Sequence, residues 1–372
     1  MGTIHGAFAR LAHAAPAAIV ADGLLQHTGN PLAEQRALAI GSAIAPLGDR
    51  TVLAVPGEDR LSWLESFSTQ RVSVLRPGDG AELLILDPSG RVEHAASVVD
   101  DGATAWLIVD SVDAAGLLDF LTKMRFRLRV DPRDASDEYA VVGGTAGALA
   151  AVRAAAPSGV ALVWHDPWPG VTEGGWAYST ADPHPGAERV WAEALIDAAE
   201  AERLAAAVAS GALKVAGALA VDALRVAAWR PRIADADDRL LPHEADWLRS
   251  AVHLDKGCYR GQETVAKVHN LGHPPRRIVA LQLDGSDSAL PSRGDVVRAG
   301  EKEAGTIVAA AMHYEQGPIA LALVRRSTPV DVDLVVDTAH GPVAAAQEVI
   351  VPPEAGATAS VPRLPRLGRR RA

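Results

Sequence analysis

The fold of this chain is limited most by a change of pattern near residue 276. From Arg277 onward, apolar residues come in short runs separated by Gly, Pro and Asp, namely IVALQLDG, DVVRAG, GTIVAAAMH, IALALV and VDLVVDT. Such runs are typical of antiparallel strands joined by tight turns. We therefore predict a small antiparallel sheet or β-barrel over residues 274–350, with a domain boundary at 273–276.

Before that boundary, strand-like and helix-like segments alternate. Periods of two and of about 3.6 in the apolar residues distinguish the two kinds of segment. Strands are predicted at 50–55, 82–87, 92–99, 106–109, 126–130 and 161–165, and helices at 59–70, 114–125 and 188–209. A strand–helix unit is predicted at 138–156, and an acidic helix is expected between His243 and Cys258. Together with the C-terminal strands, this mixture indicates an α+β protein.

The length predicts more than one packed unit. A chain of 372 residues is longer than one hydrophobic core usually serves. We expect an α+β region at 20–130, a middle α+β region at 131–273 that is interleaved with it, and the barrel. Residues 351–372 are predicted to form a flexible basic tail that is solvated or binds acidic partners, because they combine prolines with Arg363, Arg366, Arg369, Arg370 and Arg371.

Charge and composition exclude several classes of protein. Lys plus Arg number 36 and Asp plus Glu number 46, and a net charge of −10 disfavours non-specific nucleic-acid binding. No window of 18 apolar residues is present, so no membrane span is expected. The single cysteine, Cys258, rules out a disulfide framework within the chain and fits a reducing compartment. We therefore expect a soluble, cytoplasmic protein.

The most informative motif is the octapeptide KGCYRGQE around Cys258. The thiolate is the reactive form of cysteine, and the cations Lys256 and Arg260 would stabilise it if they lie within a few ångströms. Gly257 and Gly261 allow sharp bends and close approach of a ligand. Cys258 is accordingly predicted to be a reactive thiol, and the alternative is an inert, small apolar side chain.

The same octapeptide resembles the signature of the YgfZ family of folate-binding proteins. This family is related to the glycine-cleavage T-protein, an aminomethyltransferase, and to a mitochondrial iron–sulfur assembly factor. Other stretches are similar to the family in the same order: GEDRLSWLESFSTQ, LILDPSGRVEHAASVV, LPHEADWLRSAVHLDKGCYRGQE and GTIVAAAMHYEQGPIALALV. The resemblance covers roughly residues 41–336.

This resemblance implies a three-domain, ring-like fold with a central channel and a C-terminal antiparallel β-barrel. It further implies binding of tetrahydrofolate, by the 20–130 region among others, and support of iron–sulfur cluster assembly or repair. The partners would then be folate and iron–sulfur client or assembly proteins. Cys258 matches the functional thiol of the family, and its surroundings would be shaped by Lys256, Gly257, Tyr259, Arg260, Gly261, Gln262 and Glu263.

Two stretches depart from related patterns. T-proteins resemble one another in a Gly-Gly-x-x-Asp-Asp turn, whereas residues 90–95 here read GRVEHA, with Glu93 and no aspartate pair. Relatives tend to carry Leu-Arg-x-Glu-Ala-Gly where residues 224–229 read LRVAAW, so Ala227 and Trp229 replace the acid and the glycine. Arg225 is predicted to bind a folate carboxylate and Trp229 to stack on a pterin ring, although Trp229 also suits a core position.

Other candidate sites are weaker. His253, Cys258, His269 and His273 have the spacing H-x4-C-x10-H-x3-H, but structural zinc sites favour two thiolates, so no metal is predicted. Residues 143–147, GGTAG, lack the complete phosphate-loop motif and predict a tight turn. Three tryptophans in a loop-rich stretch could line a cleft for a planar ligand or simply pack: Trp164, Trp168 and Trp176.

Three functions remain open at this stage. The first is a tetrahydrofolate-binding protein that acts on iron–sulfur proteins through Cys258. The second is a folate-dependent aminomethyl or methyl transferase, and the third is a non-catalytic scaffold for iron–sulfur client enzymes. The sequence does not decide whether the protein is an enzyme.

Overall fold

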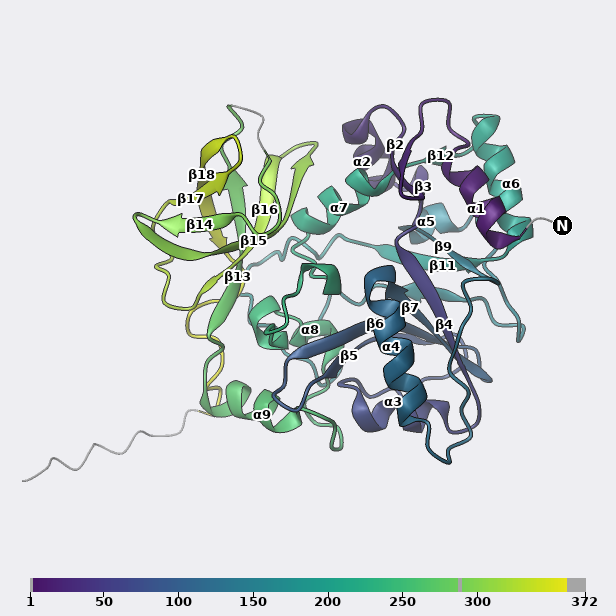
Figure 1. The fold of residues 1–372 in the computed structure, drawn as a ribbon, viewed down its shortest axis with the longest axis horizontal. Coiled ribbons are helices and arrows are strands. Elements are labelled where there is room, and N and C mark those ends of the chain that lie inside the picture. Colours follow the sequence, from purple (N-terminus) through teal and green to yellow (C-terminus); the bar gives the residue numbers. More distant parts are fainter. Residues whose placement is uncertain (1–2, 287–289, 360–372) are drawn as a thin grey trace, which may run out of the picture.

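The computed structural model describes residues 3–286 and 290–359. Within these residues, the strands form two five-stranded sheets, a closed barrel and a two-stranded hairpin, and helices pack against them (Figure 1). The hairpin consists of β1 (Ile19–Ala21) and β2 (Leu24–His27), and it is followed by α2 (Pro31–Ala39). The chain is therefore α+β, as the sequence predicts.

The first five-stranded sheet has the order β10-β11-β9-β3-β12. Its outer face is covered by α1 (Ile4–Ala12) and α6 (Ala198–Ala209), whose Leu11 and Leu204 share a core with Val142 of the sheet. The short helix α5 follows one central strand. The strands and this helix are β3 (Ala43–Pro46), β9 (Ala140–Thr145), α5 (Ala146–Leu149), β10 (Val163–His165), β11 (Trp191–Ile196) and β12 (Lys214–Val215).

The second five-stranded sheet has the order β5-β6-β7-β4-β8 and is antiparallel throughout. Two helices, α3 (Arg60–Phe67) and α4 (Ser111–Met124), pack Leu64 and Leu117 against its outer face. The whole sheet is inserted in the chain between β3 and β9 of the first sheet, so the two are interleaved. Its strands are β4 (Arg50–Pro56), β5 (Gly80–Leu86), β6 (Val92–Asp100), β7 (Thr104–Asp110) and β8 (Arg133–Asp134).

The two sheets face each other across a shared apolar core. Val52, Trp106 and Ile108 of the second sheet lie in the same cluster as Trp191 and Leu195 of the first. Because side chains alternate between the two faces of a strand, each sheet buries one face here and the other under its helices. This part of the molecule therefore has four layers, in the order helix, sheet, sheet, helix.

Strand β11 corrects the helix predicted at 188–209. Only its second half is helical, because residues 191–196 form a strand that pairs with β9 and β10. All six residues of this strand are buried. Trp191 and Leu195 face the core between the sheets, and Ala192 and Ile196 face the helices. A strand buried on both faces shows no period of two, so its apolar run merged with the pattern of the helix that follows.

Two other predictions are also wrong. The segment 126–130 is not a strand, since Phe126 has a φ of 43° and is 81% exposed, and the chain turns there after α4. The acidic helix expected before Cys258 is replaced by the 3₁₀ helix η2 (Pro242–Ala245) and the short helix α8 (Leu248–Ala251). Two of its acidic residues, Glu244 and Asp246, are fully buried, and Glu244 accepts hydrogen bonds from Arg276.

The C-terminal barrel is confirmed. Six antiparallel strands close in the order β13-β16-β15-β14-β17-β18. The first strand begins at Arg276, at the predicted boundary. The strands are β13 (Arg276–Leu283), β14 (Val296–Ala299), β15 (Lys302–His313), β16 (Gly317–Arg325), β17 (Leu334–Thr338) and β18 (Gly341–Val349), and their inward side chains form one core.

Three further elements connect the barrel with the sheets. Helix α7 (Ala218–Ala227) lies against β15 and β16, the 3₁₀ helix η1 (Ile233–Asp235) follows it, and α9 (Gln262–Leu271) leads into the barrel. After the barrel, residues 351–359 return to α9: Val351 is buried, and the Thr358 amide donates to the carbonyl oxygen of His269 at 3.0 Å. These residues therefore belong to the folded body, and the arginines predicted in the tail lie outside the described residues.

The described part of the chain contains no helix that is long and apolar enough to cross a lipid bilayer.

Candidate functional site

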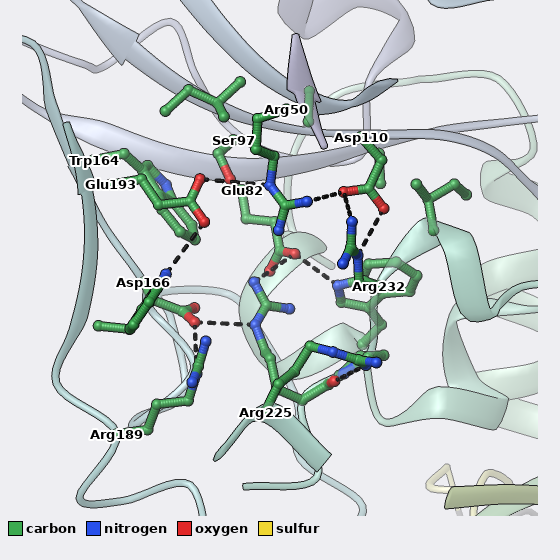
Figure 2. A pocket seen from close by; sticks show the side chains of 18 residues that line it. Arg50, Glu82, Ser97, Asp110, Trp164, Asp166, Arg189, Glu193, Arg225 and Arg232 are labelled. Carbon is green, nitrogen blue, oxygen red and sulfur yellow. Dashed lines mark hydrogen bonds and ion pairs between the residues drawn. The ribbon is translucent and has the colours of Figure 1, made fainter. Parts of the chain in front are cut away.

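A charged pocket lies at the centre of the molecule, where the two five-stranded sheets meet the segment 225–247. Figure 2 shows arginine and carboxylate side chains that point toward one another across this space. The pocket has a volume of about 70 Å³ and three tryptophans, Trp164, Trp191 and Trp247, form part of its wall. We call it the central pocket.

Some charged residues of the central pocket lie at the ends or in the middle of apolar strands, and others lie in the segments that follow strands or helix α7. Arg50 begins β4 and Asp110 ends β7, and the antiparallel register places these two residues opposite each other. Glu82 lies in β5 and Glu193 in the middle of β11, both on buried strands. The remaining charges are Asp166, which follows β10, Arg189, Arg225 and the pair Arg230 and Arg232 after α7.

Arg230 occupies a key position in the pocket. Its Nη2 lies 2.8 Å from Oε1 of Glu82, and its Nε lies 3.2 Å from Oδ2 of Asp166. Burial opposes the charged form, but these two carboxylates outweigh it and raise the pKa of Arg230 above its usual value. Nη1 of this buried guanidinium has no hydrogen-bond partner among residues 3–286 and 290–359. A residue that lines the pocket thus carries a buried cationic donor that has no protein partner among the described residues.

A second ion-pair group stands on the opposite side. Asp110 accepts from Nη1 of Arg50 at 2.7 Å and from Nη2 of Arg232 at 2.9 Å. Asp49 belongs to the same ion-pair group. Burial alone would raise the pKa of its carboxyl group, but the nearby Arg50 and Arg232 lower this pKa to about 2. These carboxylates are therefore anions that hold the two arginines in place.

Glu193 differs from the other carboxylates of the pocket. Burial raises its pKa above the usual value, and the nearest cation is Nε of Arg50 at 3.8 Å. Burial also lowers the pKa of Arg189 to about 10. The pocket therefore combines well-paired charges with a carboxyl group whose anion is only weakly compensated, and such a group is suited to accept hydrogen bonds from a bound ligand.

Arg225 lines the pocket, but its guanidinium already binds protein groups. Nη1 donates to Oδ2 of Asp235 at 2.5 Å and to the carbonyl oxygen of Arg230 at 3.0 Å, and Nε donates to Asp222 at 3.0 Å. A folate carboxylate would have to replace one of these acceptors. In this arrangement, Arg225 holds the segment 230–235 against α7.

Trp229, the other predicted folate contact, lies elsewhere. It is buried, its ring stands edge-on to His184 at 5.3 Å, and it lines a different cavity of about 260 Å³ between α7 and the barrel. Its φ of 58° is in the left-handed region, where glycine is favoured and where the related pattern has a glycine. The structure therefore does not bring Arg225 and Trp229 together in one pocket.

Cys258 is an exposed free thiol in the segment between α8 and α9. It is not part of the wall of the central pocket. The residue is therefore open to solvent, and its reactivity stays a prediction. The surroundings differ from the expectation in one respect, which concerns the two flanking cations.

Lys256 does not face solvent beside the thiol. Its side chain is buried, and Nζ donates to the carbonyl oxygens of Glu65 at 2.6 Å, Ser68 at 2.5 Å and Gln70 at 3.3 Å. Burial lowers the pKa of this ammonium group to about 8. Lys256 therefore ties the cysteine segment to the C-terminal end of α3, where helix carbonyl oxygens lack intrahelical partners.

Arg260 is also engaged away from the thiol. Its guanidinium forms an ion pair with Glu93 of β6 and lies 5.8 Å from the centre of the Phe120 ring. These groups line a wide cavity of about 940 Å³ between the β5–β6 turn and α4. Neither flanking cation is thus committed to the sulfur.

The other motif residues have separate roles. Gly261 has a φ of 80°, and a Cβ there would lie 2.6 Å from the carbonyl oxygen of Asp87, so the β5–β6 turn packs directly on this glycine. A Cβ on Gly257 would meet no atom within 4 Å. Tyr259 is buried, and Gln262 begins α9 with the exposed Glu263 beside it.

Two histidines of the zinc-like spacing form hydrogen bonds within the protein. Nδ1 of His269 lies 3.0 Å from the Tyr178 hydroxyl, and Nδ1 of His273 lies 2.8 Å from the carbonyl oxygen of Ala355. The described residues contain no cluster of three or more metal-ligating side chains. The tryptophans also separate: Trp168 is fully buried, Trp164 faces the central pocket, and Trp176 is 44% exposed.

The comparisons with known proteins concern the barrel and the overall fold. Residues 276–353 match a family described as "CAF17, C-terminal beta-barrel domain". The glycine cleavage system aminomethyltransferase T from Bartonella henselae superposes with a TM-score of 0.67 over 90% of this chain and 93% of that chain. The chain has the aminomethyltransferase T fold. The two sequences are 15% identical, so this likeness concerns the fold alone.

Two other comparisons add no relative. Aspartate kinase from Synechocystis is 9% identical over 80% of this chain and 46% of that chain, with a TM-score of 0.18. No curated protein matches the sequence significantly.

Although the chain has this fold, residues 90–95 read GRVEHA and do not contain the aspartate pair of the Gly-Gly-x-x-Asp-Asp turn. Glu93 forms the ion pair with Arg260, and Nδ1 of His94 lies 2.6 Å from Asp113 on α4. Both side chains are therefore bound on the α4 side of the sheet, away from the central pocket.

Sequence reasoning missed most of the central pocket. A signal was present, because Glu82 and Glu193 interrupt the apolar strand sequences AELLIL and WAEALI. A carboxylate is rarely fully buried unless it is paired, so each of these residues implies a buried cation. Their partners Arg50 and Arg230 are distant in the sequence, and only the fold brings them together.

Proposed function

We propose that this protein binds a reduced folate in the central pocket and supports iron–sulfur cluster assembly or repair through Cys258. The observation that carries the first half is the free Nη1 of the buried Arg230. A buried donor without a partner costs about 1–3 kcal/mol, more when charged, and a ligand acceptor would recover this free energy. The second half rests on the exposed sole thiol and on the resemblance of KGCYRGQE to the YgfZ family.

The chemistry of the pocket fits a folate. A pterin ring offers N–H donors and carbonyl and ring-nitrogen acceptors, and the pocket offers carboxylates such as Glu193 and guanidinium groups such as Arg230. The tryptophan walls supply flat apolar surface for a planar ring. The donor set is therefore appropriate for the group.

The size of the pocket adds a condition. Its volume of about 70 Å³ is far below the roughly 300–1,000 Å³ of small-molecule sites. Entry of a pterin therefore requires side chains to move, and the ion pairs of Arg230 with Glu82 and Asp166 span the space. On folate binding, polar groups of the ligand would then replace Glu82 or Asp166 as partners of Arg230.

In the bound state, we expect Arg230 to donate to a ligand acceptor and Glu193 to accept from a ring N–H group. Asp110 and Asp49 keep Arg50 and Arg232 fixed, so their role is to hold the wall rather than to contact the ligand. When bound, the reduced folate would supply one-carbon or redox chemistry of its ring.

Cys258 has a separate task. A single cysteine cannot close a disulfide within its own chain, so any thiol chemistry needs a partner sulfur. The thiolate would attack one sulfur of an oxidised client, forming a mixed disulfide and releasing the other client sulfur as a thiolate. A low-molecular-weight thiol would then attack the Cys258 sulfur of the mixed disulfide and release the second client sulfur as a thiolate. A second molecule of this thiol would attack the outer sulfur now bound to Cys258, which releases the Cys258 thiolate and a low-molecular-weight disulfide. The reducing environment that this requires agrees with the predicted cytoplasmic location.

The experiment is complementation of a strain that lacks this gene, with iron–sulfur enzyme activities as the readout. Wild type should restore them and Cys258→Ser should not, whereas Gly257→Ala, next to the thiol in open space, should restore them. Full restoration by Cys258→Ser would refute the thiol role and leave a non-catalytic scaffold as the explanation.

The aminomethyltransferase T fold favours a second candidate, a folate-dependent aminomethyl or methyl transferase. Transfer of a one-carbon unit from a small amine to tetrahydrofolate would be measured at steady state. This activity should survive Cys258→Ala, because the thiol lies outside the central pocket. Against this candidate, the turn at residues 90–95 has no aspartate pair.

A further inference from the structure

Glu82 connects the central pocket with the segment that leads to Cys258. It lies in β5, is buried, and lines the pocket (Figure 2). Its Oε1 accepts from Nη2 of Arg230 and from Nε1 of Trp247, both at 2.8 Å, and its Oε2 accepts from Oγ of Ser250 at 2.6 Å. One carboxylate therefore binds the arginine that we expect to contact a ligand and also two residues of segment 247–251.

Segment 247–251 depends on such contacts for its position. Trp247 and Ser250 are fully buried, and helix α8 within this segment has only four residues. A helix of this length is not stable on its own in water. The hydrogen bonds to Glu82 are therefore part of what holds α8 in place.

Thr69 joins α8 to the cysteine segment, residues 252–261, which follows the helix directly. Its Oγ1 donates to the carbonyl oxygen of Ala251 at 2.6 Å, and its own carbonyl oxygen accepts from the amide of His253 at 2.9 Å. The end of α8 and the start of the cysteine segment thus share one anchor.

Gln70 extends this connection. Its Nε2 donates to the carbonyl oxygen of Ser250 at 3.2 Å, and its carbonyl oxygen accepts from Nζ of Lys256 at 3.3 Å. Lys256 lies two residues before Cys258. A displacement of α8 therefore disturbs contacts that also position the residues next to the thiol.

Arg230 compensates the charge of Glu82. Within residues 3–286 and 290–359, it is the one cation within ion-pair distance of this carboxylate. A buried carboxylate that loses its counter-ion is strongly destabilised unless water reaches it. Because Trp247 and Ser250 contact both of its oxygen atoms, the local opening that hydrates Glu82 is a displacement of segment 247–251. Loss of Arg230 should therefore favour this opening.

The geometry of Arg230 indicates which of its partners a ligand replaces. Asp166 binds Nε at 3.2 Å, Glu82 binds Nη2, and Nη1 has no partner among the described residues. Nη1 and Nη2 form the terminal edge of a guanidinium group, which can bind two acceptors side by side. A ligand that uses this edge competes with Glu82 and leaves Asp166 in place.

We propose that Glu82 is a positioning residue that couples occupancy of the central pocket to the mobility of the cysteine segment. When a ligand takes Arg230, Glu82 loses its counter-ion, and α8 and the cysteine segment open more often. Attack on a client disulfide requires the Cys258 sulfur to align with the S–S bond, and a more mobile segment reaches more orientations. The inference rests on the proposed folate site and adds its regulation.

Hydrogen exchange of the full-length protein at pH 7 measures this opening. Three protected amides report it, and they donate to the carbonyl oxygens of Trp247, Thr69 and Gly174 at 3.1, 2.9 and 2.8 Å: Ala251, His253 and Leu254. In wild type, saturating 5-formyltetrahydrofolate should raise the exchange rates of these reporter amides on the order of threefold or more. The amides of α4 should keep their rates.

Arg230→Met removes the counter-ion without a ligand. The rates of the reporter amides should then rise about tenfold or more, because no ligand group replaces the lost charge. Arg50→Met is the matched control, since Arg50 also lines the pocket and forms no ion pair or hydrogen bond with residues 247–258 in the described part of the chain. It should change the reporter rates less than about twofold.

Glu82→Gln tests whether the charge of Glu82 carries the effect. Glutamine fills the same space and can still bond Trp247 and Ser250, but it has no charge that could be left uncompensated. In this background, neither Arg230→Met nor the ligand should change the reporter rates. A purely structural role of Arg230 would not be suppressed in this way. The ligand experiment uses wild type and Glu82→Gln, so it does not depend on the folding of Arg230→Met.

The outcomes separate the coupling from the folate site. Equal rises in Arg230→Met and Arg50→Met, or a rise in Arg230→Met that persists with Glu82→Gln, would overturn the coupling. Saturable ligand binding in calorimetry with unchanged reporter rates in wild type would also overturn it, and the folate site would stand. Absence of ligand binding would refute the folate site, and the ligand-free variants would still decide whether Glu82 couples Arg230 to the cysteine segment.

Discussion

Replacing Arg230 by methionine should lower the free energy of unfolding by about 3 kcal/mol, a value worked from its two carboxylate partners. Removing one partner of a buried ion pair usually costs about 3–5 kcal/mol, because the other charge stays buried and uncompensated. Here the loss falls at the lower end. Glu82 keeps hydrogen bonds from Trp247 Nε1 at 2.8 Å and Ser250 Oγ at 2.6 Å, and Asp166 keeps Arg189 Nε at 3.4 Å.

The assay is urea denaturation at pH 7, followed by far-ultraviolet circular dichroism. The double variant Arg230→Met with Glu82→Gln should recover about 1–2 kcal/mol, since a neutral amide replaces the orphaned carboxylate and still bonds Trp247 and Ser250. A loss below about 1 kcal/mol for Arg230→Met, or no recovery in the double variant, would refute the view that Arg230 compensates these buried charges.

Three further predictions concern the cysteine segment and a buried acid. Gly261→Ala should lower the free energy of unfolding by more than about 2 kcal/mol, because its Cβ would lie 2.6 Å from the Asp87 carbonyl oxygen and its φ is 80°. In the same denaturation assay, the control Gly257→Ala should change this free energy by no more than about 0.5 kcal/mol. Lys256→Met should increase amide hydrogen exchange of residues 254–261 about tenfold or more, since three carbonyl oxygens lose their common donor; unchanged exchange would remove Lys256 as the tie to α3. Burial raises the pKa of Asp246 from 3.8 to about 7, so the stability given by its protonated form is complete below pH 4 and is lost as pH rises toward 7. Asp246→Asn should flatten that part of the stability profile, and urea midpoints that fall equally in both proteins between pH 4 and 7 would contradict the assignment.

The regular parts of the fold were predictable because their sequence patterns are local. The hairpin of β5 and β6 follows from two strand-like runs around Pro88 and Gly90, and the barrel follows from short punctuated runs after residue 276. One turn fixes the pairing of β5 with β6, and single turns also join β14 with β15, β15 with β16 and β17 with β18 in the barrel. The pairings of β13 with β16 and β18 and of β14 with β17, which close the barrel, are long-range and are not marked in the sequence.

The errors arose where burial removes the local pattern. Residues 191–196 form a strand that is buried on both faces, so no alternation marks it, and the neighbouring alanines favour a helix. An acidic helix was expected between His243 and Cys258, yet Glu244 and Asp246 of this segment are fully buried. Partners such as Arg276, which lies 32 positions from Glu244, are supplied by the tertiary fold alone.

The candidate site was predictable in part. The motif places Cys258 in an exposed segment, and Arg225 reaches the central pocket. The direction of each neighbouring side chain was not predictable, because Lys256 turns inward to carbonyl oxygens and Trp229 turns toward the barrel. The sequence shows which charged residues are close to the cysteine along the chain, but it does not show in which direction their side chains extend.

Equilibrium binding of a stable reduced folate, 5-formyltetrahydrofolate, to the full-length protein tests the central claim most directly. Isothermal titration calorimetry should show saturable binding to wild type and to Cys258→Ser with equal affinity. Arg230→Lys keeps the positive charge but loses the planar donor Nη1, and its affinity should fall about tenfold or more. Absence of binding to wild type, or an unchanged affinity of Arg230→Lys, would contradict the account.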